Sequence, residues 1–411
     1  MKNPSCRFCG TPLSLSFADL GMSPPSNSYL KPGHLNRMER FFPLHAWVCE
    51  SCFLVQVEEF AGPAEIFSDY AYFSSFSDSW LKHAEAYVEA TTERFGLGPD
   101  SRVVEIASND GYLLQYFIKR GIPVLGIEPA ANVAAVAQRK GVPTSVEFFG
   151  TAAAENMLRD RQQADLLVAN NVLAHVPQLN DFVRGMGLVL KPGGVFTVEF
   201  PHLLNLLQEN QFDTIYHEHF SYFSFTVAER IFAAHGMTLF DVEELPTHGG
   251  SLRIYGRHAA NNSLPVSERV VALRERERRA GLDRPETYRA FAERVRKTKR
   301  ALLKFLIEAR EAGKQVVGYG APAKSVTLFN YCGVRTDLLA YTVDRSPHKQ
   351  GCFLPGVRIP IYPSERIWET KPDYVLILPW NLRDEIIEQM SDIRAWGGRF
   401  VVPIPEARVL D

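Results

Sequence analysis

The stretch "VVEIASNDGYLL" (residues 103–114) decides the fold. It begins with an apolar run that places Glu105 near the end of a strand, and a turn of small residues leads from there into a helix. A Rossmann-like turn needs small residues so that the backbone can approach a ligand at the helix N-terminus. Only Gly111 remains of the dinucleotide fingerprint G-x-G-x-x-G, and Asp110 would repel a pyrophosphate. The stretch therefore argues against NAD and predicts a ligand with a positive or neutral centre.

Short β-rich runs alternate with helical stretches around this turn. We expect parallel strands at 102–107, 123–128, 164–170 and 194–200, and closing antiparallel strands at 237–245 and 250–256. Such an alternation predicts βαβ units in an α/β domain that spans 66–258. Residues 66–96 are expected as a helical lead-in, with its helix starting after an N-cap at Asp78 or Ser79.

Acidic residues end two successive strands of this domain. Glu128 lies 17 residues beyond Gly111, where a carboxylate can accept hydrogen bonds from both hydroxyls of a ribose. Glu105 and Glu128 suit S-adenosylmethionine, because its sulfonium and ammonium groups are both cationic. Together with "LKPGGVF" (190–196), whose turn should precede a late strand, these elements resemble the class I methyltransferase fold. We expect S-adenosylmethionine to be bound by Glu105, Ala107, Asn109, Gly111, Glu128, Asn170 and Asn171.

Asn170, Asn171 and His175 follow the strand at 164–170. Ligands of an open α/β sheet bind beyond the carboxyl ends of its strands, so these side chains are expected at the border between cofactor and substrate. The alternative is structural, with Asn170 capping a helix and His175 lying on the surface.

Four of the six cysteines form two CxxC pairs within the first 52 residues. This spacing is typical of thiolates that surround a tetrahedral zinc ion. We expect a zinc-binding module over residues 1–65, with a structural ion; the alternative is a pair of free-thiol turns. The predicted ligands are Cys6, Cys9, Cys49 and Cys52.

A charged helical linker is expected at 259–312, followed by a second Rossmann-like α/β domain at 313–411. Its strands are expected at 315–320, 338–344, 373–378 and 399–405. "GYGAPAK" (318–324) keeps two glycines of a nucleotide turn but has Ala323 at the third position. A nicotinamide cofactor, with Asp344 on its ribose, stays an alternative to a sugar nucleotide whose diphosphate lies near Lys324. Asn381 and Arg383 could border the same site.

"YHEHFSYFS" (216–224) holds two histidines, a glutamate and two tyrosines in nine positions. His217 and His219 could chelate a metal, but no third ligand is evident, and a structural turn is also open. The third alternative is general acid–base chemistry, for which a histidine that titrates near neutral pH is suited. Neighbouring residues of a strand point to opposite faces, so for Glu218 and His219 to meet one substrate the segment should be a loop or a helix start.

The CxxC pairs, "YAYFSS" (70–75), "EIASNDG" (105–111), "YHEHFSYFS" and "GYGAPAK" occur in the order found in the sugar C-methyltransferases, and the resemblance covers essentially the whole chain. It implies S-adenosylmethionine, a structural zinc ion and a dTDP-linked sugar that is methylated at C3 beside a C4 ketone. It also implies that His219 is the base, with Glu218, Tyr216, Tyr70 and His175 around the sugar. The expected substrate-binding residues are Tyr72, Ser74, Tyr222, Lys324, Asn381 and Arg383.

The composition of the chain argues against nucleic-acid-binding, membrane and secreted proteins. The chain has 411 residues, 46% of them hydrophobic, and a formal net charge of −2, which provides no attraction to nucleic acid or to anionic membranes. It has no apolar run of about 18 residues and no signal-peptide pattern, so we expect a cytoplasmic enzyme, a monomer with a homo-oligomer left open. The alternatives are a nicotinamide-dependent sugar-nucleotide oxidoreductase and a zinc-ribbon RNA-binding methylase.

Overall fold

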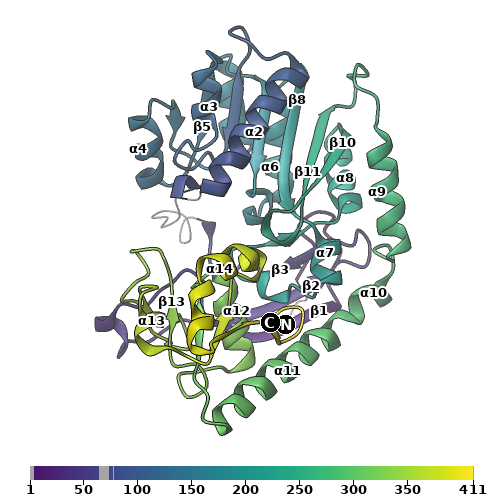
Figure 1. Cartoon of the computed structure of the whole chain (residues 1–411). Helices are drawn as coiled ribbons and strands as arrows, with labels where there is room; N and C mark the ends of the chain where they lie inside the picture. The colour runs from purple at the N-terminus through teal and green to yellow at the C-terminus, as the bar shows by residue number, and fades with distance from the viewer. Residues whose placement is uncertain (1–3, 64–73, 77, 411) are drawn as a thin grey trace.

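Three β-sheets organise the chain in the computed structural model, which describes residues 4–63, 74–76 and 78–410. The seven-stranded sheet occupies the upper half of the molecule in Figure 1, and the six-stranded sheet of the C-terminal part lies in the lower half. The helices α9, α10 and α11 run down one side of the molecule and connect the two. Among the described residues, no helix is both long and apolar enough to cross a membrane.

The seven-stranded sheet has the strand order β10-β11-β8-β7-β4-β5-β6. Its inner strands are parallel, and β11 runs antiparallel to both of its neighbours. This is the arrangement expected of a class I methyltransferase, and the two predicted closing strands are confirmed. The strands are β4 (Val103–Ile106), β5 (Val124–Ile127), β6 (Thr144–Ser145), β7 (Ala164–Asn170), β8 (Leu190–Pro201), β10 (Met237–Leu245) and β11 (Ser251–His258).

Helices cover both faces of this sheet. Neighbouring strand residues such as Val103 and Val104 belong to different apolar clusters, because successive side chains of a strand point to opposite faces. One cluster includes residues of α2 (Asp78–Phe95), α3 (Leu114–Lys119) and α4 (Ala131–Arg139). The other includes residues of α5 (Thr151–Arg159), α6 (Leu179–Val189) and α8 (Phe225–Ala234). The structure has α2 from Asp78, so Asp78 and Ser79 both lie within the helix, whereas one of them was predicted to be its N-cap.

The Pro-Gly-Gly turn of residues 192–194 lies within β8, although it was predicted to precede the strand. Ala164 of β7 pairs with Leu190, whereas Leu166 pairs with Val195. The extra residues on β8 therefore form a bulge between two paired regions, which lengthens the strand toward its N-terminus.

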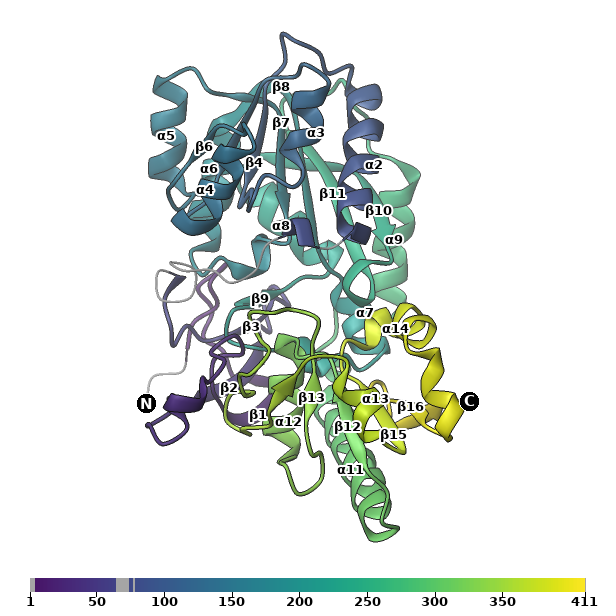
Figure 2. The same cartoon turned by 60° about the vertical axis from the view of Figure 1, so that its left-hand side comes forward.

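The small sheet has the order β1-β2-β3-β9 and contains two distant parts of the chain. β1 (Leu15–Ser23), β2 (Phe42–Val48) and β3 (Val55–Val57) come from the N-terminal region, and β9 (Ser221–Tyr222) lies within the histidine-rich stretch of residues 216–224. Figure 2 shows β3 and β9 side by side below the seven-stranded sheet. Phe17 and Val55 of this sheet share a buried cluster with Phe291 of α11 and Phe329 of α12, so the N-terminal strands pack on the C-terminal part.

The six-stranded sheet has the doubly wound order β14-β13-β12-β15-β16-β17, in which only β17 is antiparallel to its neighbour. The predicted strand at 338–344 is shorter, because residues 335–339 form a hydrogen-bonded turn. The predicted strand at 399–405 ends before Pro403, which has no N–H for a ladder. The strands are β12 (Val316–Tyr319), β13 (Thr342–Val343), β14 (Ile361–Tyr362), β15 (Tyr374–Ile377), β16 (Arg399–Val402) and β17 (Arg408–Leu410).

Helices complete the C-terminal half. The predicted linker forms α9 (Glu268–Arg279), α10 (Pro285–Arg289) and α11 (Phe291–Glu311). α11 buries Phe291, Val295, Leu302 and Leu306 on one face, and its charged residues remain outside, as expected for an amphipathic helix. The remaining helices are α7 (Leu203–Gln208), α12 (Ala323–Cys332), α13 (Arg366–Thr370), α14 (Arg383–Gln389) and the short η1 (Pro32–His34), η2 (Ser74–Phe76), η3 (Leu173–His175), η4 (Phe212–Thr214), η5 (Thr247–Gly249), η6 (Trp380–Leu382) and η7 (Ser391–Trp396).

Candidate active site

The turn after β4 has an unusual backbone. Ala107 has a φ of 57°, Asn109 one of 49° and Gly111 one of 75°. A left-handed conformation costs a residue with a side chain about 1–2 kcal/mol, and such strain concentrates at functional turns. Gly111 is required for packing, because a Cβ there would lie 2.8 Å from Cγ2 of Val142. The small residues of this turn thus bring its backbone tightly against the sheet.

At the carboxyl ends of β4 and β7, several buried polar side-chain atoms have no hydrogen-bond partner within the part of the chain that the structure describes. Native proteins leave few such atoms unpaired, so a group of them indicates a polar ligand. A cofactor with ammonium, carboxylate and ribose groups would supply partners, and in this respect S-adenosylmethionine fits the residues that the structure describes. The atoms are both carboxylate oxygens of Glu105, Oγ of Ser108, Oδ1 of Asp110, Oδ1 of Asn170 and Oδ1 of Asn171.

The acidic residues of this region differ in their partners. Glu128 accepts hydrogen bonds from the backbone N–H groups of Asn109 (3.0 Å) and Ala130 (2.9 Å). Burial raises the pKa of Glu105 well above its ordinary value, an effect that the nearby Tyr112 hydroxyl only partly opposes. Asp110 forms an ion pair with Lys140 (2.9 Å). The positive charge of Lys140 offsets the repulsion that Asp110 was predicted to exert on a pyrophosphate.

The segment that contains Glu218 and His219 is a loop, as predicted. Its turn is closed by a hydrogen bond from the His219 N–H to the Tyr216 carbonyl (3.0 Å). A second bond, from the Phe220 N–H to the Ala174 carbonyl (2.7 Å), fastens the loop to η3 beyond the end of β7. The loop therefore lies at the same edge of the seven-stranded sheet as the turn of residues 107–111 after β4, which we call the cofactor turn.

His219 is held in one tautomer. The Thr214 carbonyl can only accept a hydrogen bond, so Nδ1 of His219 carries the proton that it donates there (3.1 Å). Nε2 then accepts from the Tyr216 hydroxyl (2.8 Å). Burial, followed by the neighbouring His175, lowers the pKa of His219 well below its ordinary value. The ring is therefore neutral near pH 7, with its lone pair on Nε2.

His175 and Glu218 adjoin this ring. The ring centroids of His175 and His219 are 4.7 Å apart, and Nδ1 of His175 donates to the Glu218 carbonyl (2.8 Å). Both carboxylate oxygens of Glu218 accept from Nδ2 of Asn27 (2.8 Å each). Burial raises the pKa of Glu218 to about 7 and lowers that of His175 to about 4. His217 is buried elsewhere, where its ring bonds the Pro43 carbonyl (3.2 Å).

The C-terminal half contributes Lys324 at the start of α12. Its ammonium donates to Oδ1 of Asn381 (2.5 Å) and lies 4.2 Å from the centre of the Trp380 ring. Nε1 of Trp380 donates to Asp213 (2.7 Å), a residue of the segment that leads to Tyr216. Burial lowers the pKa of Lys324 to about 8, and it raises that of Asp213 to about 6. Lys324 is therefore connected to the histidine-rich loop through Asp213.

Other predicted site residues have different surroundings. Tyr222 is buried, and its ring lies 6.1 Å from that of His219. Arg383 is exposed beside Asp384 (3.1 Å). The Ser74 N–H donates to Oδ1 of Asn109 (2.8 Å), which connects the end of "YAYFSS" with the cofactor turn. Tyr70 and Tyr72 lie outside the described residues.

The glycines of "GYGAPAK" serve packing. A Cβ at Gly318 would lie 2.6 Å from Oγ1 of Thr342, and one at Gly320 would lie 2.5 Å from Cδ of Pro379. Asp344 accepts from the N–H groups of Ala321 (2.7 Å) and Ser346 (2.8 Å), so its carboxylate stabilises the strand-end turns. These contacts weaken the nicotinamide alternative.

The four N-terminal cysteines meet at one point. Their sulfur atoms all lie within 4.8 Å of one another, with Cys6 to Cys52 at 3.6 Å and Cys9 to Cys49 at 3.5 Å. A tetrahedral zinc site with Zn–S bonds of about 2.3 Å has sulfur–sulfur edges of about 3.8 Å, so the cluster fits zinc. Nε2 of Gln56 donates to the sulfur of Cys6 (3.2 Å), which orients that ligand from outside the cluster.

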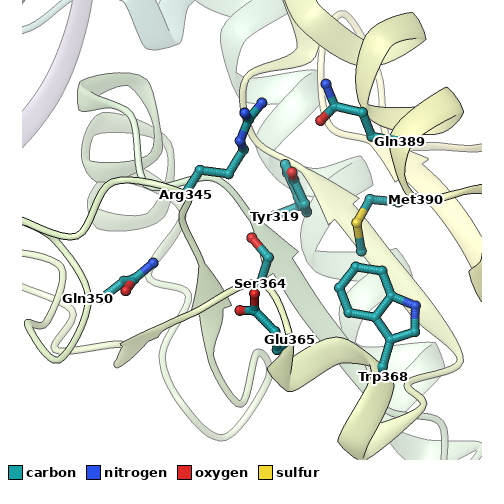
Figure 3. A pocket seen from close by; sticks show the side chains of 8 residues that line it. All are labelled: Tyr319, Arg345, Gln350, Ser364, Glu365, Trp368, Gln389 and Met390. Carbon is teal, nitrogen blue, oxygen red and sulfur yellow. The ribbon is translucent and has the colours of Figure 1, made fainter. Parts of the chain in front are cut away.

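A separate pocket of about 340 Å³ opens beside the six-stranded sheet (Figure 3). It contains none of the predicted site residues. Arg345 and Tyr319 enter it from the sheet side, and Trp368 and Met390 face each other at its opposite wall. Its lining is completed by Gln350, Ser364, Glu365 and Gln389.

Sequence reasoning missed several residues of the site. Asn27 and Asp213 come from segments with no motif, and only the folded chain brings them to Glu218 and Lys324. Trp80 of α2 lies beside Tyr112 of the cofactor turn (5.9 Å between ring centroids) and beside His248 (5.5 Å). The two glycines after His248 were the one local signal for an unusual turn.

Three family descriptions match successive parts of the chain. Residues 6–67 match a zinc binding domain, residues 80–242 a methyltransferase domain and residues 246–405 the C-methyltransferase C-terminal domain. These segments contain, in turn, the cysteine cluster, the cofactor turn with the histidine-rich loop, and Lys324.

The chain is similar to known methyltransferases over different parts of its length. C-methyltransferase NovU of Streptomyces niveus is 37% identical to this chain over 408 residues, which cover 98% of this chain and 96% of that protein. A ubiquinone biosynthesis O-methyltransferase of Bradyrhizobium sp. (strain ORS 278) is 31% identical over 100 residues, 24% of this chain and 38% of that protein. A solved S-adenosylmethionine-dependent methyltransferase from Clostridium acetobutylicum ATCC 824 covers 43% of this chain and 92% of its own, at 9% identity and a TM-score of 0.34. By its full-length similarity to NovU and its three matching segments, the chain belongs to the C-methyltransferase family of S-adenosylmethionine-dependent enzymes with an N-terminal zinc-binding module.

Proposed function

We propose that this C-methyltransferase acts on carbon 3 of a dTDP-linked 4-keto deoxysugar, in the biosynthesis of a deoxysugar for a natural product or a cell-surface glycan. The observation that supports this best is the fixed tautomer of His219. Because Nδ1–H is held by the Thr214 carbonyl, Nε2 is the nitrogen that can take up a proton. A carbon atom becomes nucleophilic when a base removes a proton next to a carbonyl group, and a neutral imidazole suits that step.

The proposal assigns the cofactor to the edge formed by the ends of β4, β5 and β7. Bound there, S-adenosylmethionine supplies an electrophilic methyl group on a positively charged sulfur. Glu128 would accept hydrogen bonds from its ribose, and Glu105 would face its cationic part. The backbone and side chains of the remaining predicted residues would complete the site, namely Ala107, Asn109, Gly111, Asn170 and Asn171.

In the proposed reaction His219 acts as the base. The C3–H bond of the sugar breaks, its proton moves to Nε2, and its electron pair forms an enolate whose charge lies largely on the C4 oxygen. C3 of the enolate is then the nucleophile that receives the methyl group, and the imidazolium returns its proton to solvent. Close alignment of C3 with the methyl group would supply much of the acceleration.

Tyr216 and Glu218 would support the base. Without substrate, the Tyr216 hydroxyl donates to Nε2. A ketone oxygen is a competing acceptor, so the hydroxyl can turn to it, release Nε2 and stabilise the enolate as charge develops. Glu218, with a pKa of about 7, can accept or donate a hydrogen bond to a sugar hydroxyl. His175 and Tyr70 are proposed to border the sugar.

The nucleotide part of the acceptor would bind on the C-terminal half. The Lys324 ammonium is a point charge suited to a diphosphate, and Asn381 already holds it in place. Arg383 follows Asn381 by two residues and is exposed, and we propose that it meets the outer phosphate. Ser74, Tyr72 and Tyr222 are proposed as further contacts of the acceptor.

Cofactor binding is expected to release a proton from Glu105. Burial raises the pKa of this carboxyl, so in the empty protein it keeps its proton to a higher pH than an ordinary glutamate, while a bound cation favours the ionised form. Affinity for S-adenosylmethionine should therefore rise with pH, by up to about tenfold per pH unit over the range in which the empty site is still protonated. Calorimetry in two buffers of different ionisation enthalpy measures the released proton.

The test variant for this measurement is Glu105→Gln, and its matched control is Glu155→Gln. Glu105→Gln should abolish proton release and weaken binding about tenfold to a hundredfold, because it loses a charged interaction. Glu155 is exposed on α5, so its variant should behave like the unchanged protein. If Glu105→Gln still releases the proton when S-adenosylmethionine binds, that proton comes from another group.

The experiment that tests the proposed function is a panel of dTDP-4-keto-6-deoxysugars incubated with the protein and S-adenosylmethionine. A mass gain of one methyl group on one sugar, located on C3 by NMR, is the expected result. A methyl group on oxygen or nitrogen, or no gain on any sugar while S-adenosylmethionine still binds, would contradict the assigned acceptor.

A further inference from the structure

The turn between β10 and β11 places three consecutive residues in the left-handed region. His248 has a φ of 56°, Gly249 one of 87° and Gly250 one of 108°. Glycine adopts such angles freely, but a histidine adopts them only with backbone strain. A strained residue of this kind persists where its surroundings determine it, and the strain often marks a functional position.

Both halves of the molecule hold this turn. A Cβ at Gly249 would lie 2.6 Å from Cη2 of Trp380 in η6, and one at Gly250 would lie 2.1 Å from Nδ2 of Asn205 in α7. Nε2 of Gln211 donates to the Gly249 carbonyl (2.8 Å), and the His202 N–H donates to the Gly250 carbonyl (3.0 Å). The backbone of the turn is therefore wedged between α7 and η6, which determines where the His248 side chain emerges.

The His248 side chain makes few contacts that would stabilise the fold among the described residues. His248 is exposed, and neither ring nitrogen has a hydrogen-bond partner among the described residues. Among the described residues its ring contact is with Trp80, at 5.5 Å between centroids and 58° between planes. His83, His202 and His217, by contrast, each bond a carboxylate or a carbonyl. Within the described parts of the chain, no side-chain hydrogen bond of His248 therefore compensates for the backbone strain at this position.

The surroundings of His248 are those of the candidate site. Trp80 contacts Tyr112 in the cofactor turn, and Trp380, on which the turn packs, lies under the Lys324 ammonium. The charges of Lys324, Glu199 and His83 all act on the His248 ring, which in turn acts on His219. Desolvation and then the positive charge of Lys324 lower the pKa of His248 below its ordinary value. At neutral pH the ring therefore offers one donor and one acceptor.

We infer that His248 binds the sugar part of the acceptor, through a hydrogen bond between its imidazole and a hexose hydroxyl that lies between Lys324 and His219. The inference rests on the proposed function, because it presumes a nucleotide-linked sugar at this site. A hydroxyl group both donates and accepts, which matches a neutral imidazole, whereas a phosphate oxygen only accepts and is better served by Lys324.

The test exploits the backbone strain. His248→Gly removes the imidazole and relieves the left-handed conformation, so thermal stability should be unchanged or higher. Affinity for dTDP-4-keto-6-deoxyglucose, measured by calorimetry on protein saturated with S-adenosylhomocysteine, should fall about three- to tenfold, the loss of one neutral hydrogen bond. Affinity for dTDP, which has no sugar, should be unchanged. If His248 had only a structural role, His248→Gly would not lower the affinity for the nucleotide sugar while leaving the affinity for dTDP unchanged.

Two further variants complete the experiment. Lys371→Gly relieves a left-handed residue (φ 47°) at an exposed position of the six-stranded-sheet region, and it should leave both affinities unchanged. His248→Asn tolerates the same φ and keeps a donor and an acceptor, so it should retain part of the sugar affinity.

Equal affinities for the nucleotide sugar in His248→Gly and the unchanged protein would overturn the inference. An unchanged protein that binds the nucleotide sugar, loses affinity on His248→Gly and still transfers no methyl group would contradict the proposed reaction alone. An unchanged protein that binds no nucleotide sugar would overturn both.

Discussion

Replacing His219 with alanine or asparagine is expected to reduce C-methylation by about 10²- to 10⁴-fold, the usual contribution of a general base. Its Nε2 is the proposed proton acceptor, and no other described nitrogen of the loop has the same fixed tautomer next to Tyr216. Asparagine can still donate to the Thr214 carbonyl, so that variant preserves the loop while losing the base. Binding of S-adenosylmethionine should be unchanged in both variants.

Proton abstraction can be measured without methyl transfer. In D₂O the unchanged protein should exchange the C3 proton of a bound 4-keto sugar for deuterium, which NMR detects, and the His219 variants should not. The matched control is His235→Asn, because His235 lies at the C-terminus of α8 and bonds Asn180 outside the site. Normal exchange and turnover in a folded His219→Ala protein would exclude His219 as the base.

Removing the zinc ion is expected to affect the site as well as the N-terminal module. Gln56 donates to the sulfur of Cys6, and its backbone pairs with Ser221 of β9, two residues beyond His219. Structural zinc sites contribute about 10–16 kcal/mol in isolated zinc-finger peptides, so loss of one thiolate should destabilise the module by several kcal/mol. Cys49→Ser should therefore lower both the first thermal unfolding transition and the rate of methyl transfer, the latter at least tenfold.

The experiment needs zinc content, calorimetry and activity on the same samples. We expect one zinc ion per chain, lost in Cys49→Ser and on treatment with a strong chelator. Cys352 lies outside the cluster and is half-buried, so Cys352→Ser should keep the metal, the unfolding transition and the activity. Full zinc content and normal stability in Cys49→Ser would show that the four sulfur atoms do not form the site.

Local sequence patterns were enough to predict most of the fold. The strands and helices of the seven-stranded sheet follow from runs of apolar residues with the periods of strands and helices, and those signals act over a few residues. The CxxC spacing indicated the metal for the same reason, since each knuckle is a single turn. The bulge of β8 was not predicted, because it depends on the register of β8 with β7.

Contacts between distant segments decided the rest. Spacing alone does not distinguish His217 from His219, yet the fold buries the first against the Pro43 carbonyl and places the second beside His175. Asn27 approaches Glu218 across 191 positions of sequence, and Ser221 joins the N-terminal sheet. The class of fold and the zinc-binding cysteines therefore follow from the sequence, because short-range periodicity and spacing specify them, and the sheet edge proposed for the cofactor stays a prediction from the same signals. Only the tertiary structure decided which side chains share one site, because hydrogen bonding and burial depend on neighbours that no local pattern names.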